Sequence, residues 1–333
     1  MITLSRRLAL LGAAAGLAIA ALTHSHDATA ADKVRVAYGD VPTVESLPIL
    51  IALERAKEKG VDIEFTSLKS EDIAAQAVIG GQADIGIGTP YALIQKVKAP
   101  VRMFYQLATL KFYPVVNTEY YKDWKDLDGE DITVHSRGSG TEAIMKLMAQ
   151  RHGIKYKTMS YVPGSEGRGG ALMQGNIKAT ILDSTNTHLV MEKMPGKFAV
   201  LPMEGINASD EALYANTDFL TKNAAAVDTI VEALVTTTRE INKNPAAAAE
   251  LRAKYKLLSD LPKDLEADIV PYYTEAAQSK MLPDNGGSAE AVKDDLDFYS
   301  IAGQLQGDAA SLKADDFWDL GPLNRAIAKL GKM

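Results

Sequence analysis

Polar side chains collect at five places where a predicted β-strand gives way to a predicted helix. These junctions span residues 40–43, 88–91, 136–141, 164–170 and 183–187. In a doubly wound sheet a ligand lies beyond the carboxyl ends of the strands. Helices that begin there present unpaired N–H groups and a partial positive charge. The junctions therefore predict a pocket that could hold a small anion without a metal ion.

Two arginines, Arg137 and Arg168, stand inside glycine-flanked junction loops. A guanidinium group can bind carboxylate or sulfonate oxygens through two parallel N–H groups, although most arginines are simply solvated. Tyr91, Phe112 and Tyr113 could wall an organic group, and for Phe112 we expect core packing instead. Together these side chains favour an organic anion over nitrate.

The same residues also fit a purely structural role. Ser139 and Glu142 form the Ser-x-x-Glu pattern of a helix capping box, and Thr89 before Pro90 is a good helix cap. The residue types leave both interpretations open. Loss of a cap lowers the melting temperature alone, whereas loss of a ligand contact also weakens binding.

Patterns typical of enzymes and metal sites are missing from the sequence. It has no cysteine, and its five histidines show no metal-ligand spacing. There is no nucleophile elbow and no phosphate-binding loop. Residues 138–143 fit Gly-x-Gly-x-x-Ala, but no acidic residue follows at the distance that a dinucleotide site needs. We therefore expect no catalysis, no cofactor and no metal.

Length and charge narrow the class of protein further. The chain has 333 residues, enough for two domains, with 47% hydrophobic and 24% charged residues, which is ordinary globular composition. Its 36 basic and 43 acidic residues give a net charge of −7, which argues against nucleic acid as a partner. We expect a monomer.

Residues 1–30 have the pattern of an export signal. Arg6 and Arg7 precede the apolar stretch 8–22, and Ala28-Thr29-Ala30 fits a cleavage site before Ala31. The stretch is shorter than the ~20 residues that span a bilayer. The Sec and twin-arginine routes both stay open. The absence of cysteine excludes a lipid anchor, so the sequence predicts a free periplasmic protein.

The elements that position the junctions alternate between strand and helix. A first block has predicted strands at 34–38, 61–66, 83–87 and 101–107, and a second block at 132–135, 159–162, 179–182 and 198–201. Such alternation is typical of parallel, doubly wound sheets. From Thr221 the pattern is all-helical, with an apolar face on the first long helix and further helices near 246–256, 262–279, 288–304 and 321–331.

Two residues outside the junctions have structural expectations. Asp84 lies between apolar residues, so a role in bonding the backbone is predicted for it. Trp124 lies in a charged stretch, so a surface position is predicted for it.

Several short motifs, in order, resemble a known family. They are the Val34-Arg35-Val36-Ala37 strand, Gly80-Gly81-Gln82-Ala83-Asp84-Ile85-Gly86, Lys125-Asp126-Leu127-Asp128-Gly129, Gly138-Ser139-Gly140-Thr141, Asn216-Thr217-Asp218-Phe219-Leu220 and Asn244-Pro245. Over roughly residues 33–256 the chain resembles periplasmic substrate-binding proteins of ABC importers in the nitrate, sulfonate and taurine group, which includes binders of thiamine precursors.

The resemblance implies an α/β fold: a two-lobed periplasmic binding protein of type II, in which each lobe has a doubly wound, mainly parallel sheet and a helical tail follows. It implies lobe 1 at 31–116 plus 216–333 and lobe 2 at 117–215, with crossings near 114–118 and 213–218. By position, the family's ligand contacts fall on Thr43, Thr89, Tyr91, Ser139, Thr141, Ser165 and Asp183.

The function implied is binding without catalysis. The protein would close on a small organic anion, a sulfonate or carboxylate, and deliver it to the membrane permease. A binder of thiamine-type pyrimidines is the alternative within this class, and it needs aromatic stacking and a carboxylate. An enzyme on the same fold, similar to chorismate dehydratase, is the alternative from another class, and the export signal speaks against it.

Overall fold

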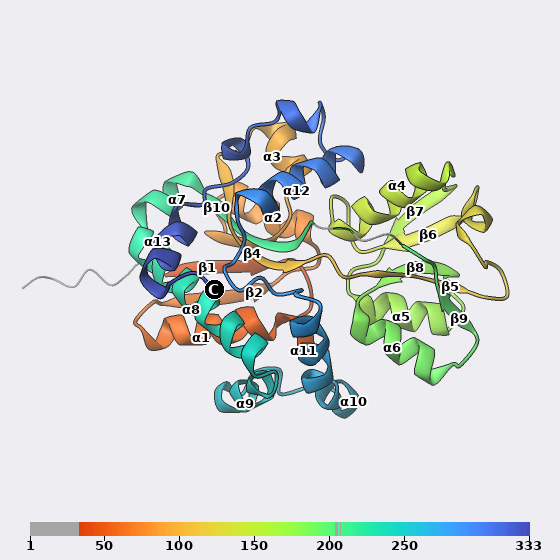
Figure 1. Ribbon diagram of the computed structural model, residues 1–333, viewed down its shortest axis with the longest axis horizontal. Helices are drawn as coiled ribbons and strands as arrows, with labels where there is room; N and C mark the ends of the chain where they lie inside the picture. The colour runs from red at the N-terminus through yellow and green to blue at the C-terminus, as the bar shows by residue number, and fades with distance from the viewer. Residues whose placement is uncertain (1–32, 204–205, 207) are drawn as a thin grey trace, which may run out of the picture. The chain divides into compact units, whose positions relative to one another are not determined.

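The strands that the structure describes form two five-stranded sheets, and Figure 1 labels all of these strands except β3. The computed structural model describes residues 33–203, 206 and 208–333. The predicted export signal at 1–30 and its cleavage site lie outside these residues. Within the described ranges, no helix is both long and apolar enough to cross a membrane.

The first sheet contains four parallel strands and one antiparallel strand. In spatial order its strands are β2 (Ile63–Ser67), β1 (Val34–Tyr38), β3 (Ile85–Gly88), β10 (Ser209–Asn216) and β4 (Val101–Thr109). Only β10 runs antiparallel to its neighbours. The amino end of β10 therefore lies at the same edge as the carboxyl ends of the other four strands.

The second sheet repeats this arrangement. Its spatial order is β7 (Thr158–Tyr161), β6 (Asp131–Val134), β8 (Ala179–Leu182), β5 (Tyr113–Asn117) and β9 (Phe198–Val200). Here β5 is the antiparallel strand. Two mainly parallel, mixed sheets confirm the fold class that the sequence predicts.

The chain passes between the sheets earlier than the sequence predicts. It leaves the first sheet after Thr109 and enters β5 at Tyr113, and it returns between Val200 and Ser209. The predicted crossings at 114–118 and 213–218 fall on strands that are already paired in the sheet they enter. The reason is that β5 and β10 are inserted antiparallel strands, which the strand-helix alternation does not reveal.

Helices connect the strands and form the tail. Those of the two alternating blocks are α1 (Leu47–Glu58), α2 (Glu71–Ile79), α3 (Tyr91–Val97), α4 (Gly140–His152), α5 (Ser165–Met173) and α6 (Ser184–Lys193). The tail holds α7 (Thr217–Lys222), α8 (Ala224–Lys243), α9 (Ala246–Tyr255), α10 (Lys263–Ala267), α11 (Ile269–Gln278), α12 (Ala289–Ile301) and α13 (Gly321–Leu330). The single helix predicted at 262–279 is two helices, α10 and α11.

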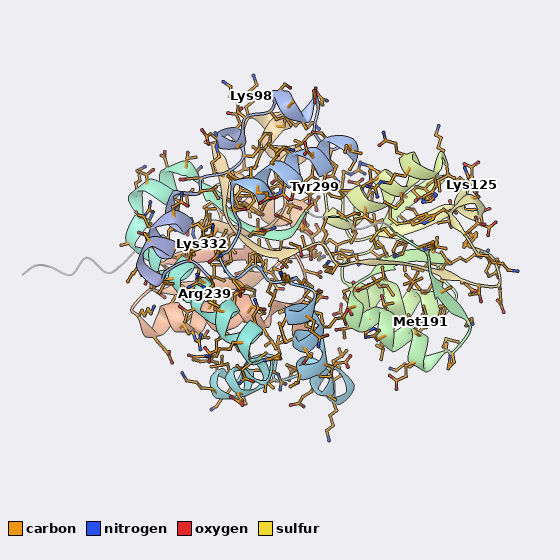
Figure 2. The ribbon with its side chains drawn as sticks, viewed as in Figure 1. Lys98, Lys125, Met191, Arg239, Tyr299 and Lys332 are labelled. Atoms are coloured by element: carbon orange, nitrogen blue, oxygen red, sulfur yellow. The ribbon has the colours of Figure 1, made fainter. Side chains whose placement is uncertain are left out.

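Apolar stripes hold these helices on the sheets. The predicted inward face of α8, which includes Val227, Ile230 and Leu234, is fully buried with α1, α13 and the first sheet. Arg239 of α8, labelled in Figure 2, donates hydrogen bonds to the Asp284 and Gly331 carbonyls. In the second sheet, α4 lies on one face and α5 and α6 lie on the other (Figure 1).

The two structural expectations have different outcomes. Asp84 accepts hydrogen bonds from the backbone N–H and the guanidinium of Arg35, which confirms its structural role. The surface position predicted for Trp124 is wrong, because its side chain is only 3% exposed. Its ring stacks on His152, and its indole N–H donates to the Pro202 carbonyl. The charges around it in sequence hid this packing.

Candidate binding site

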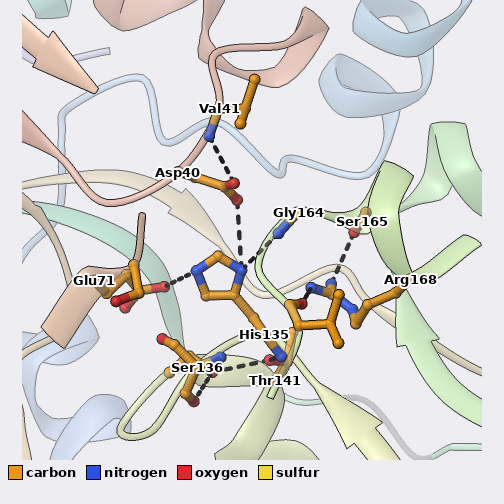
Figure 3. A network of polar contacts seen from close by, with 12 residues as sticks. Asp40, Val41, Glu71, His135, Ser136, Thr141, Gly164, Ser165 and Arg168 are labelled. Atoms are coloured by element: carbon orange, nitrogen blue, oxygen red, sulfur yellow. Dashed lines mark hydrogen bonds and ion pairs between the residues drawn. The ribbon is translucent and has the colours of Figure 1, made fainter. Parts of the chain in front are cut away.

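Residues at the carboxyl ends of strands from both sheets line one cavity of about 40 Å³. Asp40 follows β1, His135 follows β6 and Asp183 follows β8, while Asp210 and Glu211 come from the amino end of β10. The strand directions explain this convergence, because they bring all of these ends to the same edges of the two sheets. Figure 3 shows part of the resulting polar network.

Negative charge dominates the lining of this cavity, which we call the acidic cavity. Its seven carboxyl groups belong to Asp40, Glu45, Glu71, Glu166, Asp183, Asp210 and Glu211. The basic groups that line it are Arg168 and His135. In the part of the chain that the structure describes, no group of three or more acidic or histidine side chains could hold a metal ion.

Burial makes several of these carboxyl groups hard to ionise. Burial, reinforced by neighbouring carboxylates, raises the pKa of Glu71 to about 8 and that of Glu211 to about 7. It raises the pKa of Glu166 to about 7 and that of Asp40 to about 6. Several carboxyl groups in one small space repel each other when ionised, so an incoming positive charge would stabilise them.

Arg168 is almost completely buried beneath this lining. Its side chain is 1% exposed, and its guanidinium donates to the Ile181 carbonyl (3.0 Å), the Val162 carbonyl (2.9 Å) and the Ser165 hydroxyl (3.0 Å). The sequence predicts Arg168 as a ligand-binding fork. In the structure its N–H groups join β8, α5 and the residue after β7, and a ligand contact at Arg168 stays a prediction.

His135 faces two of the carboxylates and is a site residue that sequence reasoning missed. Its Nδ1 accepts a hydrogen bond from the Gly164 N–H and lies 3.5 Å from an Asp40 oxygen, as Figure 3 shows. Burial lowers the pKa of His135 to about 3, so the ring is neutral and carries its proton on Nε2. Nε2 lies 3.9 Å from Glu71 Oε1 and has no hydrogen-bond partner among the described residues. The available signal was its place at the end of a predicted strand.

The predicted hydroxyls of the 136–141 junction lie in the lining, but they also hold their own loop together. Ser139 Oγ donates to the Ser136 carbonyl and accepts from the Glu142 N–H as the cap of α4. Thr141 Oγ1 accepts from the His135 N–H. These bonds agree with the capping interpretation, and they leave a ligand contact at Ser139 and Thr141 as a prediction.

The structure brings some of the other predicted site residues together and separates the rest. Thr43, Ser165 and Asp183 line the acidic cavity. Thr89 and Arg137 line a second cavity, and Arg137 lies over the Tyr161 ring. Phe112, expected in the core, is half-buried and lines the acidic cavity.

Tyr91 is a core residue and lines neither of these two cavities. Its side chain is fully buried, its hydroxyl donates to Asp295 (2.6 Å), and it accepts from the Trp318 indole N–H (2.6 Å). The structure therefore gives Tyr91 a structural role, and the ligand contact there stays a prediction. The tail residues that surround it are too distant in sequence for local patterns to indicate them.

We expect Tyr91→Phe to lower the free energy of unfolding by about 1.5–3 kcal/mol, because it removes a hydrogen bond to a buried carboxylate. Affinity for any ligand of the acidic cavity should stay unchanged. Thermal melting and titration of the same variant check both statements. A large loss of affinity with unchanged melting would restore the ligand contact.

The arrangement of these sheets is also found in solved structures. A protein of Bordetella bronchiseptica is 22% identical, covering 90% of this chain and 98% of that chain, with a TM-score of 0.72. The periplasmic nitrate-binding protein of Synechocystis is 13% identical, and the match covers 90% of this chain and 89% of that chain, with a TM-score of 0.71. A putative periplasmic sulfonate-binding protein of Methylobacillus flagellatus is 16% identical, and the match covers 90% of this chain and 95% of that chain, with a TM-score of 0.61.

These likenesses establish the fold, that of a periplasmic binding protein of type II. The family model described as NMT1/THI5 like matches residues 44–248, more than half of the chain. The chain belongs to this family, which agrees with the resemblance seen in the sequence. No curated protein matches the chain.

Proposed function

We propose that the chain is the periplasmic substrate-binding component of an ABC importer and that it binds a small organic cation in the acidic cavity. Seven carboxyl groups line this cavity, and its one guanidinium is already bonded to two backbone carbonyls and a hydroxyl. This lining is the single observation that carries the choice of ligand charge.

The transport role is supported by the family and by the fold. Solved structures with this fold include a periplasmic nitrate-binding protein and a putative periplasmic sulfonate-binding protein. The predicted export signal at 1–30 supports a location in the periplasm. In this proposal the chain performs no catalysis, and its partner is the permease of the importer.

The acidic lining argues against the organic anion that the sequence predicts. At an effective dielectric constant near 20, two unit charges 4 Å apart interact by about 4 kcal/mol. Each ionised carboxylate nearby would repel an anion with an energy of this size, whereas it would attract a cation. The helix N-termini of the junctions suggested an anion, but seven carboxyl groups line the cavity, and Asp40, Glu166 and Asp183 lie in the junctions themselves.

Closure of two lobes is the proposed mode of binding. One lobe would be built on the first sheet and the other on the second sheet. The sequence predicts their limits at 31–116 plus 216–333 and at 117–215, and we propose that these limits shift to the crossings described above. Asp40 and Glu71 come from the first sheet and face His135 of the second. A ligand that binds between them would favour the closed state.

A pyrimidine of the thiamine-precursor type is a second candidate. Tyr38 and Phe112 lie in the lining beside the carboxylates. An aromatic ring that carries an amino group could contact both kinds of side chain. This candidate is a special case of the proposed cation and is tested with it.

A thermal-shift screen at pH 8 tests the proposal. The panel contains alkyl amines, aminopyrimidines, sulfonates, carboxylates, nitrate, Mg²⁺ and Ca²⁺. We expect an organic amine to stabilise the protein, by about 2.7 kcal/mol at 100 times its dissociation constant. Stabilisation by a sulfonate or carboxylate and by no amine would overturn the choice of charge, and stabilisation by Mg²⁺ or Ca²⁺ alone would replace the organic cation with a metal ion.

Charge-removing variants sharpen this test. Asp210→Asn and Glu166→Gln should each weaken binding of the amine about ten- to hundredfold, because a hydrogen bond to a charged group is lost. Glu250→Gln, on the exposed surface of α9, is the matched control and should bind like the wild type.

A further inference from the structure

A second cavity lies beside the acidic cavity and shares one residue with it, Glu71. It has a volume of about 470 Å³, and we call it the side cavity. Its lining comes from α2, from the starts of α3 and α4, from Tyr214 of β10 and from Gln304 after α12.

Two buried polar groups in the side cavity have no partner among the described residues. They are the hydroxyl of Tyr214, whose side chain is 1% exposed, and Oε1 of Gln304, whose side chain is 9% exposed. Buried polar groups are nearly always hydrogen-bonded, so each unpaired group needs an explanation. Both lie in the lining of a cavity large enough for a ligand.

The surrounding residues hold both groups in place. Gln304 Nε2 donates to the Ser139 carbonyl (3.2 Å) and to Glu142 Oε2 (3.3 Å), which fixes the amide and leaves its oxygen as a free acceptor. The ring of Tyr214 packs on Gly86, where a Cβ would come within 2.2 Å of the ring. Glycine at 86 is thus required for the ring to lie there.

The charges of the side cavity balance one another. Three acidic residues and three basic residues line it: Glu71, Asp72, Glu142, Lys96, Arg137 and Lys146. Lys146 pairs with Glu142 at 3.0 Å. Apolar atoms of Ala75, Ala92 and Leu93 complete the wall. Such a lining suits an uncharged body that can form hydrogen bonds.

The two volumes indicate how one ligand could use both cavities. About 40 Å³ holds roughly three water molecules, at 10–15 Å³ each. That space accommodates an ammonium or amidinium group with a short alkyl chain at most, but not a larger organic solute. Glu71 lines both cavities: its Oε1 lies 3.9 Å from Nε2 of His135, which lines the acidic cavity, and its Oε2 lies about 3.0 Å from where a Cβ of Gly88, which lines the side cavity, would be.

We propose that the site is bipartite: the acidic cavity binds the cationic group of the ligand, and the side cavity binds an uncharged, hydrogen-bonding body through Tyr214 and Gln304. This inference rests on the proposed function and specifies the class of ligand. The ligand is an amine attached to a body that offers a hydroxyl or amide group. The ligand passes Glu71, whose side chain must turn aside to join the two cavities.

Titration calorimetry of the full protein at pH 8 tests the inference with three probes: ethylammonium, which fits the acidic cavity alone, benzylamine, and 4-(hydroxymethyl)benzylamine. We expect affinity to rise in that order. Tyr214→Phe should weaken 4-(hydroxymethyl)benzylamine about two- to tenfold, the usual effect of one neutral hydrogen bond, and should leave ethylammonium unchanged. Tyr120→Phe, at an exposed ring outside both linings, is the matched control.

Stability provides a second readout for Tyr214→Phe. Its hydroxyl has no partner, so its removal should leave the melting temperature of the ligand-free protein unchanged or higher. If the long amines bind no better than ethylammonium, or if Tyr214→Phe binds them like the wild type, the bipartite site is wrong and the proposed function stands. If no amine of any length binds, the proposed function itself fails, and this inference fails with it.

Discussion

We expect Arg168→Met to lower the free energy of unfolding by about 3–5 kcal/mol, the usual cost of removing one partner from a buried charged network. The substitution leaves the Ile181 and Val162 carbonyls and the Ser165 hydroxyl without their donor. It also removes a guanidinium that interacts electrostatically with carboxyl groups of the acidic cavity, including Asp183 and Asp40. Chemical denaturation of the ligand-free protein measures the effect.

Two further variants show how much of the loss of stability comes from the missing charge and how much from the missing hydrogen bonds. Arg168→Lys keeps the charge but cannot reach three acceptors in different directions, so it should recover only part of the loss. Arg137→Met, at an exposed arginine, is the matched control, and we expect a change of about 0.5 kcal/mol or less. A loss below about 1 kcal/mol for Arg168→Met would contradict its structural role and favour the original prediction of a ligand-binding fork.

We expect Glu71→Gln to become progressively more stable than the wild type as the pH rises from 5 to 8, by on the order of 2–4 kcal/mol. Burial, with Glu211, Asp40 and Asp72 nearby, raises the pKa of Glu71 in the folded state to about 8, from an ordinary value of 4.5. Between about pH 4.5 and 8 the folded protein therefore holds a proton on Glu71 that the unfolded chain has already released. The stabilising effect of this protonated carboxyl group is complete below about pH 4.5 and is lost as the pH approaches 8.

Glutamine cannot ionise, so the variant does not show this loss of stability as the pH rises. Denaturation at several pH values measures the difference between variant and wild type, and Glu250→Gln on the exposed surface should follow the wild type. Parallel pH profiles for Glu71→Gln and the wild type would contradict the strong burial of this carboxyl group. Neutral His135, 3.9 Å from Glu71, has a pKa of about 3 and does not titrate in this range.

The same protonation governs ligand binding. A cation binds best to ionised carboxylates, and the pKa values of Asp40, Glu166, Glu211 and Glu71 lie between about 6 and 8. Affinity for an organic amine should therefore rise with pH across this interval.

Local patterns in the sequence determined the elements and their ends. The alternation of apolar and polar residues, the inward stripe of α8, and the capping residues Ser139 and Asp183 act between near neighbours in the chain. A periodicity of two or 3.6 residues and a hydrogen bond to a nearby N–H need no tertiary contact. For that reason most of the predicted strands and helices agree with the structure, whereas the antiparallel strands β5 and β10 and the division between α10 and α11 were missed.

Only the tertiary structure decided which charges meet. Asp40, Glu71, Glu166, Asp183 and Asp210 are scattered over the chain, and no local pattern indicates that their carboxyl groups share one cavity. The inserted antiparallel strand β10 brings Asp210 and Glu211 to the carboxyl ends of its neighbours. The partners of Arg168 and Tyr91 are likewise fixed by packing between elements. The charge of the acidic cavity depends on the sum of these distant groups, so the sequence could predict the junctions but not the charge of the cavity that they line.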